Sequence, residues 1–121
     1  MPRPYKLYLE DMLAAAGKIQ DYTKSLDFDG FKKNSMAVDA VLRNLEIIGE
    51  ASKKIPRSVR VKTPAVEWKK TAGLRDIIIH GYFGLNMQIL WDIIVQKTPS
   101  LQNQIESILS ETKKGALPFE K

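Results

Sequence analysis

The chain has 121 residues, of which 19 are basic and 14 acidic, giving a net charge of +5 at neutral pH. Hydrophobic residues make up 44% and cysteine is absent, which excludes a disulfide scaffold, a thiolate metal site and a cysteine nucleophile. The sequence has neither a membrane-length apolar run nor an apolar leader, so we expect one cytoplasmic domain, residues 1–121, with no membrane partner.

Apolar residues recur three or four positions apart, which predicts helices along the whole chain. The first helix is expected over residues 5–26. The second is expected over residues 31–55, with Asp29 as its N-cap. The third is expected over residues 64–82, because Pro64 is tolerated in the first turn of a helix.

The fourth expected helix, residues 86–97, is apolar on nearly every side, and a fifth begins near Pro99. A chain this short cannot easily cover such a helix on all sides with its own neighbours. Core burial and self-association explain the fourth helix equally well. Together the elements predict an all-α bundle of four to five helices.

The closest groupings of basic residues lie in the middle of the sequence. They are Lys53-Lys54, followed by Arg57, Arg60 and Lys62, and then Lys69-Lys70. An ordinary solvated surface is the simpler interpretation. The alternative is a strip that contacts phosphate groups.

The single histidine, His80, lies close in sequence to Arg75, Asp76 and Tyr82. Asp76 precedes His80 by four residues, so its carboxylate could bond the imidazole and fix its tautomer. Arg75 and His80 are five residues apart, which is about 140° around a regular helix. A helix loosened near Gly81, long side chains that bridge the angle, or a second copy of the chain could bring the two together.

Histidine and arginine without a carboxylate cluster fit metal-independent cleavage of RNA. The imidazole would remove the proton of a ribose 2′-hydroxyl, which then attacks the adjacent phosphorus. The guanidinium would offset negative charge on the phosphoryl oxygens. This route is confined to RNA because DNA lacks the hydroxyl, and it requires no cofactor or metal.

The stretch from Arg75 to Tyr82 contains an arginine, four residues, a histidine, any residue and a tyrosine. This pattern resembles the signature of HEPN-domain proteins, and specifically the HepT branch, the ribonuclease toxins of MntA–HepT toxin–antitoxin systems. Residues 39–51 are similar to the second-helix signature of the family. Residues 68–75, 82–84 and 91–92 also match, so the resemblance covers most of residues 5–110.

The resemblance implies a HEPN-like homodimer in which Arg75 and His80 are the catalytic pair at a cleft between subunits. It implies an endoribonuclease toxin of a type VII system with RNA as its substrate. It also implies that an MntA-like nucleotidyltransferase antitoxin adenylylates Tyr82. Asp76 departs from the residue common in the family and would serve His80 or Arg75.

Three residues of the second-helix signature could support this site: Asn44, Glu46 and Glu50. Glu46 and Glu50 are four apart and share a helix face, where they could pair with a basic group, while a metal site is the less favoured interpretation. Helix packing is the simpler explanation for the signature as a whole. The alternative function is a non-catalytic helical module that binds a nucleotide or a partner protein through the same cleft.

Overall fold

The computed structural model describes the backbone of residues 3–81 and 86–113 and the side chains of residues 3–74 and 86–112. Every regular element in these ranges is helical, which confirms the all-α class. No helix in the described ranges has the length and hydropathy needed to cross a bilayer. In chain order the elements are α1 (Tyr5–Thr23), α2 (Phe28–Lys33), α3 (Ser35–Lys53), α4 (Arg57–Arg60), α5 (Trp68–Gly81), α6 (Met87–Asp92), the π-helical turn η2 (Ile93–Lys97) and α7 (Thr98–Lys113).

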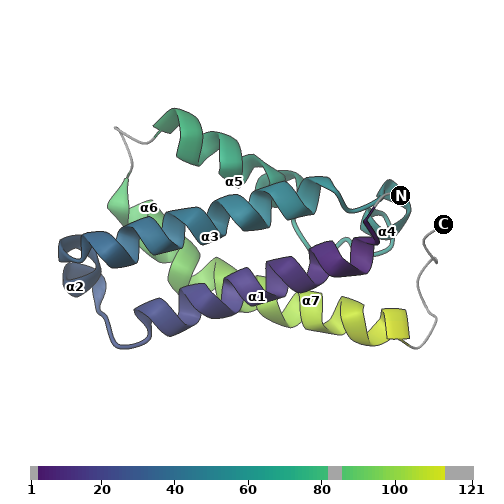
Figure 1. Ribbon diagram of the computed structural model, residues 1–121, viewed down its shortest axis with the longest axis horizontal. Coiled ribbons are helices and arrows are strands. Elements are labelled where there is room, and N and C mark those ends of the chain that lie inside the picture. Colours follow the sequence, from purple (N-terminus) through teal and green to yellow (C-terminus); the bar gives the residue numbers. More distant parts are fainter. Residues whose placement is uncertain (1–2, 82–85, 114–121) are drawn as a thin grey trace.

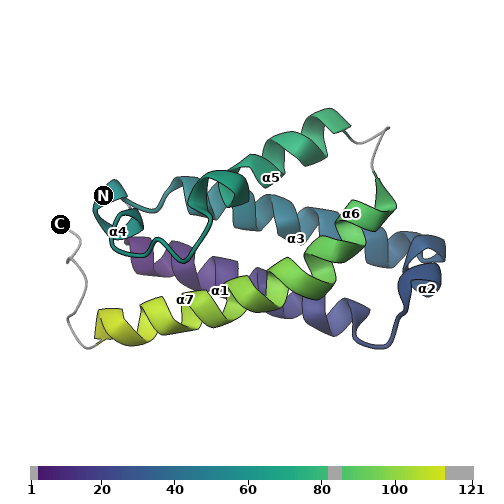
Figure 2. The same ribbon diagram turned by 180° about the vertical axis from the view of Figure 1, so that it is seen from behind.

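Helix α3 is the centre of the bundle. It packs against α1 on one side and against α5 on the other, and α7 packs against α1 (Figures 1 and 2). The short helices α2 and α4 lie at opposite ends of the long axis (Figure 1). The core is mainly aliphatic and also encloses the ring of Phe31, and its other fully buried members include Leu9, Met12, Ile19, Val41, Leu45, Ile48 and Ile105.

The predicted apolar stripe of the first helix is confirmed. Its members within α1 are all buried: Tyr5, Leu9, Met12, Ala16, Ile19 and Thr23. Thr23 satisfies its buried hydroxyl by donating to the carbonyl of Ile19 at 2.7 Å. Helix α1 ends at Thr23 rather than at Leu26, so the predicted boundary was three residues too long.

The prediction of one second helix is wrong, because Asn34 divides it into α2 and α3. Asn34 has extended backbone angles, and its side chain accepts a hydrogen bond from the backbone N–H of Ala37 at 3.0 Å. Asp27, not Asp29, is the N-cap of α2 and accepts from the N–H of Gly30 at 2.7 Å. Short polar side chains bond local backbone groups in this way and thereby start new helices.

The third helix begins at Trp68 and not at Pro64, so the predicted start is also wrong. The indole N–H of Trp68 donates to the carbonyl and the hydroxyl of Thr63, at 3.2 and 3.1 Å. The Thr63 hydroxyl in turn donates to the carbonyl of Val59 at 2.8 Å. These bonds hold the segment before α5 in a non-helical path, and the extra turn α4 precedes it.

The predicted start of a further helix near Pro99 is confirmed, because α7 begins at Thr98, but α6, η2 and α7 follow one another without interruption. Proline lacks an N–H, and its ring clashes with the carbonyl four residues earlier in a regular α-helix. The wide π turn directly before α7 shifts the carbonyls that precede Pro99, so the helix can continue through the proline without this clash. Two of the displaced carbonyls find side-chain donors: Thr98 bonds Ile93 at 2.9 Å, and Gln20 bonds Ile94 at 3.2 Å.

The segment from α6 to η2 is covered on one side only. Leu90 and Ile94 are buried in the core, whereas Ile89 is 58% exposed and Val95 is 52% exposed. Burial in the core therefore explains the apolar residues on one side of this segment but not those on the other side. Two large aliphatic side chains on its other side remain uncovered by the rest of the described chain.

Two leucines of α1 provide a matched test of this core. Leu9 is fully buried and Leu7 is 37% exposed. Leu9→Ala should lower the free energy of unfolding by about 2–5 kcal/mol, because it removes buried methyl groups and leaves a cavity. Leu7→Ala should lower it by less than about 1 kcal/mol. Urea denaturation followed by circular dichroism measures both, and equal losses would contradict the position of the core.

Candidate functional site

The last turns of α5 carry the predicted catalytic positions. Arg75, Asp76 and His80 belong to α5, whereas Tyr82 lies outside the described residues. The α5 backbone is α-helical through Gly81, so a helix loosened near Gly81 does not bring Arg75 and His80 together. Bridging side chains and a second copy of the chain remain as explanations.

The register of α5 separates the two positions further. Trp68 and Thr71 are buried, and steps of three and four residues from them reach the position of Arg75. Lys69 is exposed, and a Cβ built on Gly73 would meet no atom within 4 Å. The same steps from Lys69 and Gly73 reach the positions of Asp76 and His80. In one chain, the arginine position is therefore in helical register with the buried stripe of Trp68 and Thr71, and the histidine position is in register with the open stripe of Lys69 and Gly73.

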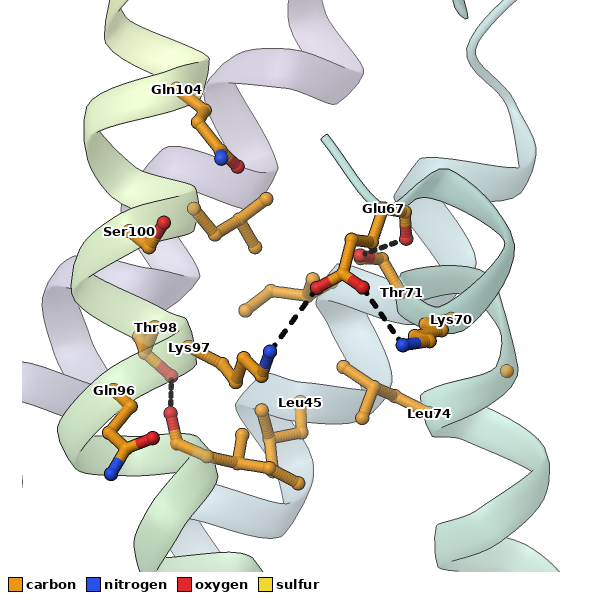
Figure 3. Close-up of a pocket in the computed structure, with 14 residues that line it drawn as sticks. Leu45, Glu67, Lys70, Thr71, Leu74, Gln96, Lys97, Thr98, Ser100 and Gln104 are labelled. Atoms are coloured by element: carbon orange, nitrogen blue, oxygen red, sulfur yellow. Dashed lines mark hydrogen bonds and ion pairs between the residues drawn. The ribbon is translucent and has the colours of Figure 1, made fainter. Parts of the chain in front are cut away.

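A groove of about 480 Å³ lies beside α5 (Figure 3). Its floor is apolar and includes Leu45 and Ile48 of α3 and Leu74 of α5, the residue directly before Arg75. The opposite wall comes from η2 and α7. The polar side chains around it are Glu67, Lys70, Gln96, Lys97, Ser100 and Gln104.

An ionic bridge spans this groove. The Glu67 carboxylate bonds the Lys70 ammonium at 3.0 Å within its own helical turn and the Lys97 ammonium at 3.3 Å across the groove (Figure 3). Hydrogen bonds from Lys70, and then from Lys97, hold the pKa of Glu67 below its ordinary value. Gln104 of α7 also donates to the carbonyl of Ala65 at 3.0 Å. The segment that leads into α5 is therefore tied to η2 and α7.

The sequence reasoning missed Glu67. A signal was nevertheless present, because Glu67 is the single acidic residue between Glu50 and Asp76, in a stretch rich in lysine and arginine. An isolated acid among bases is a natural hub for ion pairs. Its pairing across the groove depends on the tertiary position of Lys97, which helical periodicity does not give.

The three supporting residues on α3 do not share one environment. Asn44 is buried and donates its side-chain N–H to the carbonyl of Ala40 at 2.8 Å, a bond within its own helix. Glu46 and Glu50 line a second hollow of about 360 Å³ between α1 and α3. This hollow is also lined by Tyr8, Asp11, Arg43 and Lys54.

The second hollow combines acidic and basic groups of α1 and α3. Asp11 is occupied by Arg3, at 2.6 Å, and Arg3 also lies over the ring of Tyr8. Among the described residues, no three acidic or histidine side chains gather closely enough to hold a metal ion. The structure brings Glu46 and Glu50 together with Arg43 and Lys54 in this hollow. The support of Arg75 and His80 by the two glutamates stays a prediction.

Comparison with known proteins shows what this chain is similar to. Residues 12–108 match the family model described as "Ribonuclease HepT-like". The chain is 41% identical over 112 residues to a protein of Caldanaerobacter subterraneus subsp. tengcongensis, covering 93% of this chain and 97% of the relative. It is 42% identical over 106 residues to a protein of Methanocaldococcus jannaschii, covering 88% of this chain and 97% of the relative.

A third relative comes from Thermococcus cleftensis and is 39% identical over 108 residues, covering 89% of this chain and 98% of the relative. The first two relatives are named as candidate RNases, and the name of the third specifies ribonuclease HepT. No solved structure matches the chain at a significant level. The matched region contains α5 and the whole of the groove.

Proposed function

Since the chain belongs to the HepT-like ribonuclease family, we propose that it is the endoribonuclease toxin of a type VII toxin–antitoxin system, acting in the cytoplasm. The family establishes the enzyme class, a ribonuclease, and RNA as its substrate. The observation that carries the finer proposal is the arginine–histidine–tyrosine pattern within the matched region, whose arginine and histidine positions lie on the last turns of α5.

We propose that cleavage proceeds without a metal ion. The imidazole of His80 takes the proton of a ribose 2′-hydroxyl, and the freed oxygen attacks the adjacent phosphorus. The bond from phosphorus to the 5′-oxygen of the next nucleotide breaks, and that oxygen receives the proton from the imidazolium. The products are a 2′,3′-cyclic phosphate and a 5′-hydroxyl. Arg75 binds the phosphate and offsets the charge of the transition state, and Asp76 orients the imidazole.

The proposed enzyme is a homodimer. One chain has a single histidine, and the regular α5 helix separates the Arg75 and His80 positions by about 140°. In a dimer, Arg75 of one chain can act with His80 of the partner subunit, so the angle between the two positions on one helix is no obstacle. The dimer also contains a second imidazole. The exposed Ile89 and Val95 support self-association, because a partner would remove their side chains from water.

Two roles follow for groups around the pair. We propose that Asn44, Glu46 and Glu50 support the site from α3, the helix against which α5 packs.

We also propose that an MntA-like nucleotidyltransferase silences the enzyme by attaching AMP to Tyr82, two residues after His80 in the sequence. The adenylyl group would add bulk and negative charge next to the catalytic pair, and both would oppose an RNA phosphate.

Replacement of His80 tests the catalytic assignment. His80→Ala should slow RNA cleavage by roughly 10²- to 10⁴-fold, because the base that activates the 2′-hydroxyl is lost. The wild-type protein should cleave equally well in EDTA and leave cyclic phosphate ends. Purified protein, labelled RNA and end-group analysis provide the measurement.

Met36→Ala serves as the control for this test, since Met36 is 82% exposed at the start of α3 and belongs to no proposed site. It should cleave RNA at the wild-type rate. Cleavage of RNA by the His80→Ala variant at the wild-type rate in EDTA would refute the role of His80 as the base. Binding of RNA by the wild type without any cleavage would favour the non-catalytic module instead.

Replacement of Tyr82 tests the neutralisation. Co-expression with a cognate nucleotidyltransferase should raise the intact mass of the wild-type chain by one adenylyl group. Tyr82→Phe should keep its mass and remain toxic, because it lacks the hydroxyl that accepts AMP. Tyr22→Phe, which alters a 45% exposed tyrosine on α1, should still gain the group. An unchanged wild-type mass while growth is rescued would refute the modification.

A further inference from the structure

The positive charge of this protein is concentrated in one segment. Residues 51–75 contain eight basic residues and one acidic residue, a net charge of +7. The other 96 residues contain eleven basic and thirteen acidic residues, a net charge of −2. The whole positive excess of the chain therefore comes from a fifth of its length, which includes α4 and the beginning of α5.

The basic side chains of this segment are presented to solvent. Lys53, Lys54, Arg57, Arg60, Lys62, Lys69 and Lys70 are all exposed. Lys70 pairs with Glu67, and the Nε of Arg60 donates to the carbonyl of Ile55 at 3.1 Å. Within the part of the chain that the structure describes, the other five form no ion pair. Their charges are available to an external anion.

The backbone beneath these side chains is firmly held. Ile55, Val59 and Val66 alternate with the basic residues along the sequence, and each is at most 3% exposed. Trp68 bonds Thr63, and Gln104 bonds the carbonyl of Ala65. The segment is thus anchored to the core from inside and charged on its outer side, so little ordering is needed when a partner binds.

This segment is continuous with the proposed catalytic helix. Lys69 begins the open stripe of α5 that reaches the His80 position eleven residues later, which is about 16 Å along the helix axis. A strand of RNA held at the His80 end of that stripe could extend toward Lys69 and α4. The acidic Asp76 lies between them, so attraction for phosphate is concentrated at the α4 end.

We propose that the exposed basic side chains of residues 53–70, which we call the basic end, bind the phosphodiester backbone of single-stranded RNA beyond the cleaved phosphate. The inference rests on the proposed function and extends it. Its argument is charge complementarity: five exposed cations that form no ion pair with any described residue face a substrate that carries one negative charge per nucleotide. Contacts of this kind give affinity without base specificity.

A charge-matched pair of variants tests the basic end. The test variant combines Lys53→Gln, Arg57→Gln and Lys62→Gln. The control variant combines Lys18→Gln and Lys24→Gln, in and directly after α1, with Lys33→Gln in α2, and all three side chains are exposed. Helix α2 lies at the opposite end of the molecule from α4 (Figure 1). Lys53 and Lys33 both stand in the last turn of a helix, so the effects on helix ends are comparable.

Both triple variants are made in the full-length His80→Ala background, so that RNA stays intact. Fluorescence anisotropy with a labelled single-stranded RNA then gives Kd over a series of salt concentrations. The test variant should bind about tenfold more weakly at low salt, and its log–log salt slope should be shallower by roughly 2, since three phosphate contacts are lost. The control should bind within about twofold of its parent at 150 mM salt, where distant charges are screened. Thermal unfolding by circular dichroism verifies that both remain folded.

The outcomes separate this inference from the proposed function. Weaker binding by the test variant alone supports the basic end, even if the wild-type protein proves unable to cleave RNA. Equal weakening in both variants would show that only net charge matters and would overturn it. Parent protein that does not bind RNA, or a test variant with unchanged Kd and salt slope, would also overturn it.

Discussion

The packing of α5 against α3 is the constraint on which the remaining structure depends. Helix α5 meets the bundle through one stripe, with Trp68 and Thr71 buried and Lys69 on the open side. The contact fixes both the axis and the rotation of α5, and the helix stays regular through Gly81. Its last turns therefore carry the arginine and histidine positions on different sides. A catalytic site that needs both groups at one phosphate requires long side chains that bridge this angle or a group from a second chain.

The charged residues around α5 form two groups with different surroundings, the paired Glu67 and the basic end. Glu67 pairs with both Lys70 and Lys97, so this single acid ties the start of α5 to η2 instead of repelling a nucleic acid. Among the described residues, most charges of the neighbouring basic end have no such partner. Chemistry on the last turns of α5 and backbone binding near its first turn would then act on one strand, with the specificity of the reaction set by the 2′-hydroxyl.

Periodicity was sufficient to predict the all-α class and the buried stripe of α1, because burial along a helix repeats every three to four residues. It did not predict the division at Asn34 or the continuous path through Pro99. Both depend on bonds that periodicity ignores: an asparagine side chain that caps a new helix, and a π turn stabilised by Gln20 from a distant helix. The candidate site followed from motif spacing, whereas the Glu67 bridge required the tertiary fold.

The most direct test of a site shared between two chains is complementation between two inactive variants. Differently tagged Arg75→Ala and His80→Ala chains are co-expressed, and mixed dimers are isolated by tandem affinity purification. A mixed dimer keeps Arg75 on one chain and His80 on the other, so a shared site predicts that RNA cleavage returns while each parent dimer stays inactive. Mixed dimers as inactive as their parents would contradict a shared site built from one Arg75 and the His80 of the other chain.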